Sequence, residues 1–144
     1  MTPRIVKKVF VYLVRDGSDL LLLSHSLHPE AGLQVPAGTI MPGEDPRDAA
    51  RRELVEETGL VDFEIKVLLG ERIYDMRPFG KDELHHRYFF HAALTGEAPE
   101  RWRHEEVHAE TGPIPLELFW WDLHGSPPDL IVGHGEVLGA LDLT

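Results

Sequence analysis

The chain has 144 residues, no cysteine, and 25 acidic side chains against 14 lysines and arginines, which gives a formal net charge of −11. This length predicts one domain over residues 1–144 with a sizeable core. The missing cysteines exclude disulfides and thiolate metal sites and favour a cytoplasmic location. The acidic balance argues against nucleic acid as a partner, and residues 9–14 form an apolar run too short for a signal peptide or a membrane span.

The first third of the chain has the pattern of strands and loops. Residues 5–14 are β-branched and aromatic and predict a strand, which a turn at Asp16-Gly17-Ser18 connects to a second strand over residues 20–24. A third short strand over residues 33–36 leads into a glycine-rich loop at Gly38.

Local signals then define a helix over residues 46–58. Asp45 is a favourable N-cap, Pro46 suits the first helical position, and Gly59 suits the left-handed residue that ends a helix. Glu53 and Glu57 fall beside the apolar stripe of this helix, the side that we expect to face a sheet. A solvated helix held by ion pairs would instead place its charges opposite that stripe.

The carboxylates of this helix predict a metal site. Glu53, Glu56 and Glu57 share an arc of roughly 100° on the helix, because each residue advances the helix by about 100°. They repel one another unless a positive charge lies among them. Hard divalent cations take such oxygen ligands and share them with substrate phosphates, so the helix indicates a metal site for a polyphosphate substrate.

The remaining elements complete a mixed architecture. We expect strands over residues 63–69, with 71–74 as a candidate continuation, 86–94 and 116–123, a loop over 77–84 and a closing helix over 135–141. The long polar segment 95–113 predicts no element. This order favours an α/β fold with a mixed β-sheet covered by helices.

The spacing of the charged residues carries a family resemblance. Gly38, five residues, Glu44, seven residues, Arg52-Glu53-Leu54, one residue, Glu56-Glu57, one residue and Gly59-Leu60 match the Nudix box, G-x5-E-x7-R-E-U-x-E-E-x-G-U with U aliphatic. Residues 33–38 are also similar to the strand and loop that precede this box. The chain therefore resembles the Nudix hydrolases over residues 33–60, which implies a Nudix-type α/β/α sandwich.

The resemblance implies an activity and a cofactor. It implies hydrolysis of the pyrophosphate bond in a nucleoside diphosphate linked to another moiety, such as a nucleotide sugar, ADP-ribose, a dinucleoside polyphosphate or a nucleoside triphosphate, by a monomer or homodimer. Mg²⁺ or Mn²⁺ would be held by Glu53, Glu56, Glu57 and the Gly38 carbonyl. Arg52 would orient Glu53, and Glu44 would assist.

A carboxylate must also take a proton from the attacking water. Glu53 is one candidate. The family can instead use a later glutamate as base or extra ligand, and the choices here are Glu97, Glu100, Glu105, Glu106 and Glu110, with Glu105 and Glu106 preferred.

Substrate contacts outside the box are less constrained. Arg77 and Arg87 are candidate phosphate contacts, although each could equally be a solvated charge. Trp102 and His104 could line the pocket by stacking on a base or contacting phosphate, or Trp102 could simply close the core. Pro36-Ala37-Gly38 is similar to ADP-ribose enzymes, whereas Tyr74 and Pro78 do not have the spacing of known substrate subgroups.

Two alternative functions compete with this interpretation. A nucleotide-binding module without turnover would be expected to lose ligand glutamates, and this box retains them all. His104-Glu105-Glu106-Val107-His108 also fits H-E-x-x-H, the helical motif of zinc peptidases. Glycines and prolines bracket this motif within barely three turns, which disfavours the required helix.

Overall fold

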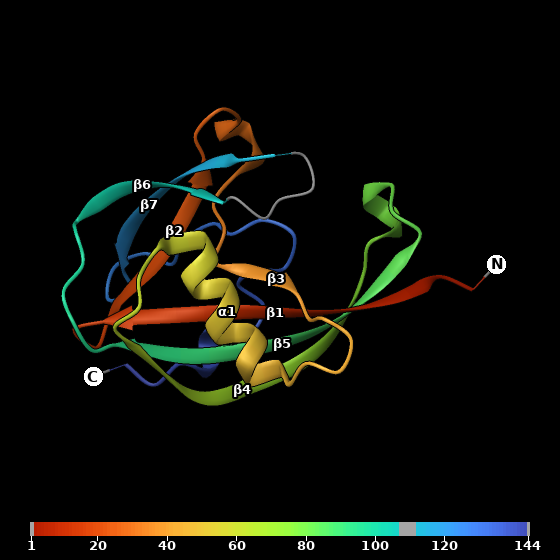
Figure 1. The fold of residues 1–144 in the computed structure, drawn as a ribbon, viewed down its shortest axis with the longest axis horizontal. Coiled ribbons are helices and arrows are strands. Elements are labelled where there is room, and N and C mark those ends of the chain that lie inside the picture. The colour runs from red at the N-terminus through yellow and green to blue at the C-terminus, as the bar shows by residue number, and fades with distance from the viewer. Residues whose placement is uncertain (1, 107–111, 144) are drawn as a thin grey trace.

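One mixed sheet of seven strands organises the computed structural model, which describes residues 2–106 and 112–143. The strands are β1 (Arg4–Arg15), β2 (Asp19–His25), β3 (Ala37–Thr39), β4 (Phe63–Asp75), β5 (Glu83–Leu94), β6 (Arg101–Glu106) and β7 (Ile114–Asp122). Their order is β4-β5-β1-β2-β7-β6, and β3 also pairs with β1 (Figure 1). The β1–β5 pair is parallel and the other pairs are antiparallel, so the predicted mixed sheet is confirmed.

The helix α1 (Pro46–Thr58) has the predicted bounds. The Asp45 side chain accepts a hydrogen bond from Arg47 N at 2.8 Å, and Gly59 ends the helix at φ 76°. In Figure 1 α1 crosses one face of the sheet in front of β1 and β5. Its buried side chains include Leu54, which packs in one core cluster with Val11 and Phe90. This packing fixes the position of the helical glutamates relative to the sheet.

The opposite face of the sheet is covered by the C-terminal segment. Val137 is buried there in a second cluster with Phe10 and Phe89. The predicted closing helix over residues 135–141 is wrong, because only the 3-10 helix η3 (Leu138–Ala140) forms. Gly135 and Gly139 each cost an α-helix about 1 kcal/mol relative to alanine, which favours the irregular path.

Several strand boundaries also differ from the sequence prediction. Residues 33–36 contribute only isolated bridges, at Leu33 and Gln34, and β3 begins after them. β4 continues through residues 69–71 and has two register shifts, one between Ile65 and Val67 and one between Leu68 and Gly70. β5 begins within the predicted loop. Two further 3-10 helices are η1 (Pro29–Ala31) and η2 (Arg77–Phe79). No helix among the described residues is long and apolar enough to cross a membrane.

Candidate active site

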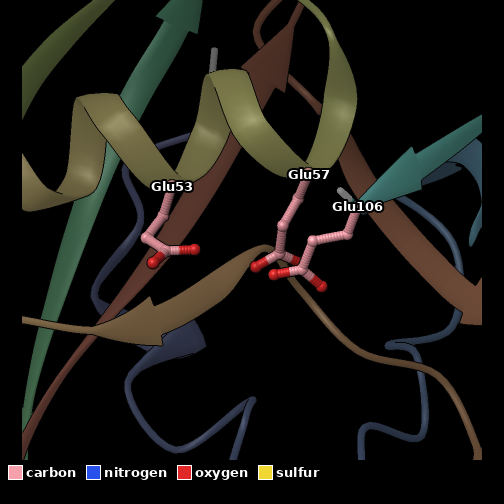
Figure 2. Close-up of side chains that lie close together, drawn as sticks. All are labelled: Glu53, Glu57 and Glu106. Carbon is pink, nitrogen blue, oxygen red and sulfur yellow. The ribbon is translucent and has the colours of Figure 1, made fainter. Parts of the chain in front are cut away.

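Three carboxylates from two elements meet at one end of α1. Glu53 and Glu57 project from the helix, and Glu106 projects from the last position of β6 (Figure 2). One carboxylate oxygen from each lies within 4.8 Å of the others. We call these three residues the carboxylate cluster.

Arg52 organises the residues beside the cluster. Its Nε and Nη2 donate to the two oxygens of Glu44, each at 2.9 Å, and its Nη1 donates to Glu53 Oε1 at 2.8 Å. The Glu44 carboxylate raises the pKa of Arg52, and the Arg52 guanidinium lowers the pKa of Glu44. Glu44 also accepts from Met41 N at 3.0 Å. This network ties the loop before α1 to the helix and holds the Glu53 carboxylate in one orientation.

The other expected ligands lie at the edge of the cluster. The Glu56 carboxylate is outside the cluster and lies 3.3 Å from Arg52 Nη1. Gly38 lies against Glu53, because a Cβ at position 38 would overlap the Glu53 carboxyl group. The absence of a side chain at Gly38 therefore makes room for that carboxylate.

Burial disfavours the ionised form of the carboxylates in the cluster. Glu53 and Glu57 are each only 6% exposed. Burial raises the pKa of Glu53 to about 7, although the Arg52 hydrogen bond acts in the opposite direction. Burial and the nearby Glu106 also raise the pKa of Glu57, whose Oε1 accepts from Ala37 N at 2.9 Å. Hard oxygen donors that are buried and close together fit a divalent cation, which would offset their repulsion.

The cluster borders a cavity of about 1380 Å³ that also has basic residues on its wall. The acidic residues on this wall are Glu44, Asp45, Glu53, Glu83 and Glu106, and the basic residues are Arg4, Lys7, Lys8 and Lys81. Lys8 was missed by the sequence analysis; it donates from Nζ to Thr39 Oγ1 at 2.8 Å. Burial lowers the pKa of Lys8, and neighbouring Lys81 lowers it further. The sequence signal that could have identified Lys8 is the pair Lys7-Lys8 within an otherwise apolar strand.

Neither predicted arginine contact lies beside the cluster. Arg87 is 1% exposed, and its guanidinium lies 4.7 Å from the Phe10 ring centroid and 4.0 Å from that of Tyr74. It belongs to the face opposite α1, because strand alternation pairs it with the Phe10 side of the sheet. Arg77 lies in η2, donates to Asp75 and does not line the cavity.

Trp102 and His104 face the helix rather than an open pocket. Trp102 Nε1 donates to Thr58 O at 2.9 Å, and the ring packs on the core cluster beneath α1. This placement favours the core interpretation of Trp102 over base stacking. His104 Nε2 lies 3.0 Å from Glu56 O. The zinc-peptidase helix is wrong, because residues 101–106 form a strand; His108 lies outside the described residues.

The structure separates the candidate later acids. Glu105 is exposed on the other face of β6 from Glu106. Glu100 pairs with Arg15 at 2.9 Å, and Glu97 is exposed in the loop before β6. Glu110 lies outside the described residues. Of the described candidates, Glu106 is the one that lies within the carboxylate cluster.

Comparison with known proteins places this geometry in a family. The family model described as NUDIX domain matches residues 5–131. The chain belongs to the Nudix hydrolase family. This is a family of pyrophosphohydrolases that typically depend on a divalent metal, and the carboxylate cluster is consistent with that dependence.

Individual Nudix proteins match this chain over a short stretch or at low sequence identity. Nudix hydrolase 25 from Arabidopsis thaliana is 44% identical over 50 residues, which span 35% of this chain and 29% of that protein. The chain therefore matches under a third of the length of this relative.

Two solved structures share the Nudix fold. A UDP-X diphosphatase has a TM-score of 0.65 at 19% identity, over 98% of this chain and 62% of that one. A C. elegans Ap4A hydrolase has a TM-score of 0.60 at 23% identity, over 83% and 81% of the two chains. At these identities the likeness shows the fold, and the two names describe different substrates.

Proposed function

We propose that this Nudix protein hydrolyses the pyrophosphate bond of a nucleoside diphosphate linked to another moiety, with Mg²⁺ or Mn²⁺ as its cofactor. The observation that supports this most strongly is the carboxylate cluster of Glu53, Glu57 and Glu106 beside a cavity that also contains basic side chains. The carboxylates suit a divalent cation, and the basic groups suit the phosphates of the substrate.

The cluster would hold the cation, with Glu56 and the Gly38 carbonyl as further candidate ligands at its edge. A bound divalent cation would neutralise charge on the phosphate oxygens and lower the pKa of a water molecule. Arg52, held by Glu44, keeps the Glu53 carboxylate oriented toward the cluster. The hydrogen bond from Ala37 N does the same for Glu57.

Proton transfer would use a carboxylate of the cluster. The water oxygen bonds to phosphorus, the water proton moves to a carboxylate, and the leaving phosphate oxygen keeps the electron pair of the broken anhydride bond. Glu53 is one candidate for this role because its carboxylate belongs to the cluster and is held by the hydrogen bond from Arg52 Nη1. Glu106 lies within the same cluster and is the second candidate.

A substrate panel tests the proposal. Hydrolysis of ADP-ribose, nucleotide sugars, dinucleoside polyphosphates and nucleoside triphosphates would be measured with Mg²⁺ and with Mn²⁺, in ¹⁸O-labelled water. At least one class should be cleaved, with one ¹⁸O atom entering a phosphate product. Glu53→Gln and Glu57→Gln should each lower kcat at least about a hundredfold, because each removes a ligand or base from the reacting centre.

Glu105→Gln is the matched control. Glu105 is exposed on the other face of β6, so its substitution should leave kcat within about twofold. All variants would be checked for folding by thermal unfolding. Near wild-type turnover in both Glu53→Gln and Glu57→Gln would contradict this assignment of the active site.

A further inference from the structure

One face of β6 is directed at α1. Along the strand Trp102, His104 and Glu106 are half-buried, whereas the residues between them are exposed. This period of two places all three side chains on one face of the strand. In order along this face, Trp102 packs on the core, His104 forms a hydrogen bond, and Glu106 belongs to the carboxylate cluster.

The first two side chains bind the carboxyl end of the helix. The last carbonyls of an α-helix lack partners within the helix. Trp102 Nε1 donates to Thr58 O at 2.9 Å, and His104 Nε2 lies 3.0 Å from Glu56 O. A carbonyl oxygen can only accept, so His104 Nε2 carries the proton and donates.

Gly59 allows the His104 ring to lie against the end of the helix. A Cβ at Gly59 would lie 3.0 Å from His104 Cε1 and Nδ1, which is tighter than ordinary contact. The glycine is thus required both by its left-handed backbone, at φ 76°, and by the adjacent ring. His104 therefore has a defined position between β6 and α1.

The position of Glu106 depends on how β6 lies against α1. Glu106 is the last residue of β6, an edge strand whose neighbour among the described strands is β7, whereas Glu53 and Glu57 belong to α1. The distance from Glu106 to the two helical carboxylates is therefore set by the contacts between β6 and α1, to which His104 contributes.

We propose that His104 is a positioning residue, which fixes β6 on the end of α1 and thereby holds Glu106 at binding distance from Glu53 and Glu57. The inference rests on the proposed function, because it takes the cluster to be the divalent-metal site. His104 itself touches neither metal nor substrate in this account.

Mn²⁺ affinity, measured by isothermal titration calorimetry, tests this role without using activity. His104→Gln keeps a donor at about the reach of Nε2, whereas His104→Asn is an amide that is too short. We expect His104→Asn to weaken Mn²⁺ binding about tenfold, and His104→Gln to stay within about threefold of wild type. His124→Asn, at an exposed histidine, should leave the affinity unchanged.

A double-mutant comparison separates positioning from general destabilisation. If His104 acts through Glu106, His104→Asn should cause no further loss of Mn²⁺ affinity in a Glu106→Gln background, where Glu53 and Glu57 remain. An equal loss in both backgrounds would overturn the inference, as would unchanged affinity in His104→Asn. Should His104→Asn not fold, His104→Ser serves as a second short variant, assayed below its unfolding transition. A wild-type protein that binds no Mn²⁺ would contradict the metal site itself.

Discussion

At the scale of single residues, the ionisation of Glu53 in the metal-free protein depends on the balance between burial and Arg52. Burial disfavours the ionised carboxylate, and the guanidinium favours it. Burial is the larger effect, so in the metal-free protein Glu53 gains its proton near neutral pH rather than near its ordinary pKa of 4.5. Its residue type was predictable from the Nudix box, but the direction of its pKa was not, because burial depends on the packing of α1 against the sheet.

This raised pKa predicts a pH-dependent cost in stability. Between 4.5 and about 7 the folded protein binds more protons at Glu53 than the unfolded chain does, so the free energy of unfolding falls as pH rises. The contribution is fully present below pH 4.5 and is lost as pH rises through about 7. Because Glu53 is buried, a rise from 4.5 to about 7 corresponds to about 3 kcal/mol at 1.36 kcal/mol per unit.

Urea unfolding of metal-free wild type and Glu53→Gln at several pH values checks this prediction. Glutamine does not titrate, so Glu53→Gln should become progressively more stable relative to wild type between pH 4.5 and 7.5. A stability difference that does not change with pH would show that Glu53 ionises normally in the folded protein.

At the scale of elements, local signals were sufficient for α1 and insufficient for β6. The bounds of α1 follow from Asp45 and Gly59, which are adjacent to the helix in sequence, so both ends were predicted correctly. Half of β6 is exposed, and its pairing with β7 and its contacts with α1 are distant in sequence. The polar composition of residues 95–113 therefore did not predict β6, the strand that places Glu106 in the site.

The same long-range effects explain the other incorrect interpretations. Arg87 is of a residue type that suits a phosphate contact, but its register in β5 places it beneath the C-terminal segment. The apolar pattern of residues 135–141 predicted a helix. These residues instead form an irregular segment that places Val137 in the core. When the register of a strand is unknown, residue type and spacing do not show which face of the sheet a side chain occupies.

The position of Trp102 predicts a structural effect. Trp102→Ala should lower the free energy of unfolding by about 2–3 kcal/mol, since it removes a half-buried ring from the core under α1. Trp102→Phe keeps most of the packing and loses the hydrogen bond to Thr58 O, so it should cost only about 1 kcal/mol. Chemical denaturation measures both. Unchanged stability together with a tenfold higher KM in Trp102→Ala would instead indicate a base-stacking role.

At the scale of the whole molecule, this acidic chain places four basic residues on the wall of one cavity, together with five acidic ones. The net charge of −11 opposes the approach of a phosphate substrate, whereas Arg4, Lys7, Lys8 and Lys81 line the cavity beside the cluster. The family match over residues 5–131 extends well beyond the box, in agreement with a sheet that positions groups from both ends of the chain.

This arrangement predicts a binding role for Lys8. Lys8→Met should raise KM for a nucleotide substrate about tenfold and leave kcat within a few-fold, because contact with a non-reacting phosphate is equally favourable before and during the reaction. Steady-state kinetics measure this, with Lys66→Met, at a lysine paired with Glu64, as the control. An unchanged KM would show that Lys8 serves only its hydrogen bond to Thr39.

The proposed divalent-metal centre of this Nudix hydrolase consists of Glu53, Glu57 and Glu106. An anomalous difference map from a crystal of the protein grown with Mn²⁺ tests it most directly. We expect a manganese peak bounded by carboxylate oxygens of all three residues. An ordered Mn²⁺ bound elsewhere, or a map with no peak at the cluster, would contradict it.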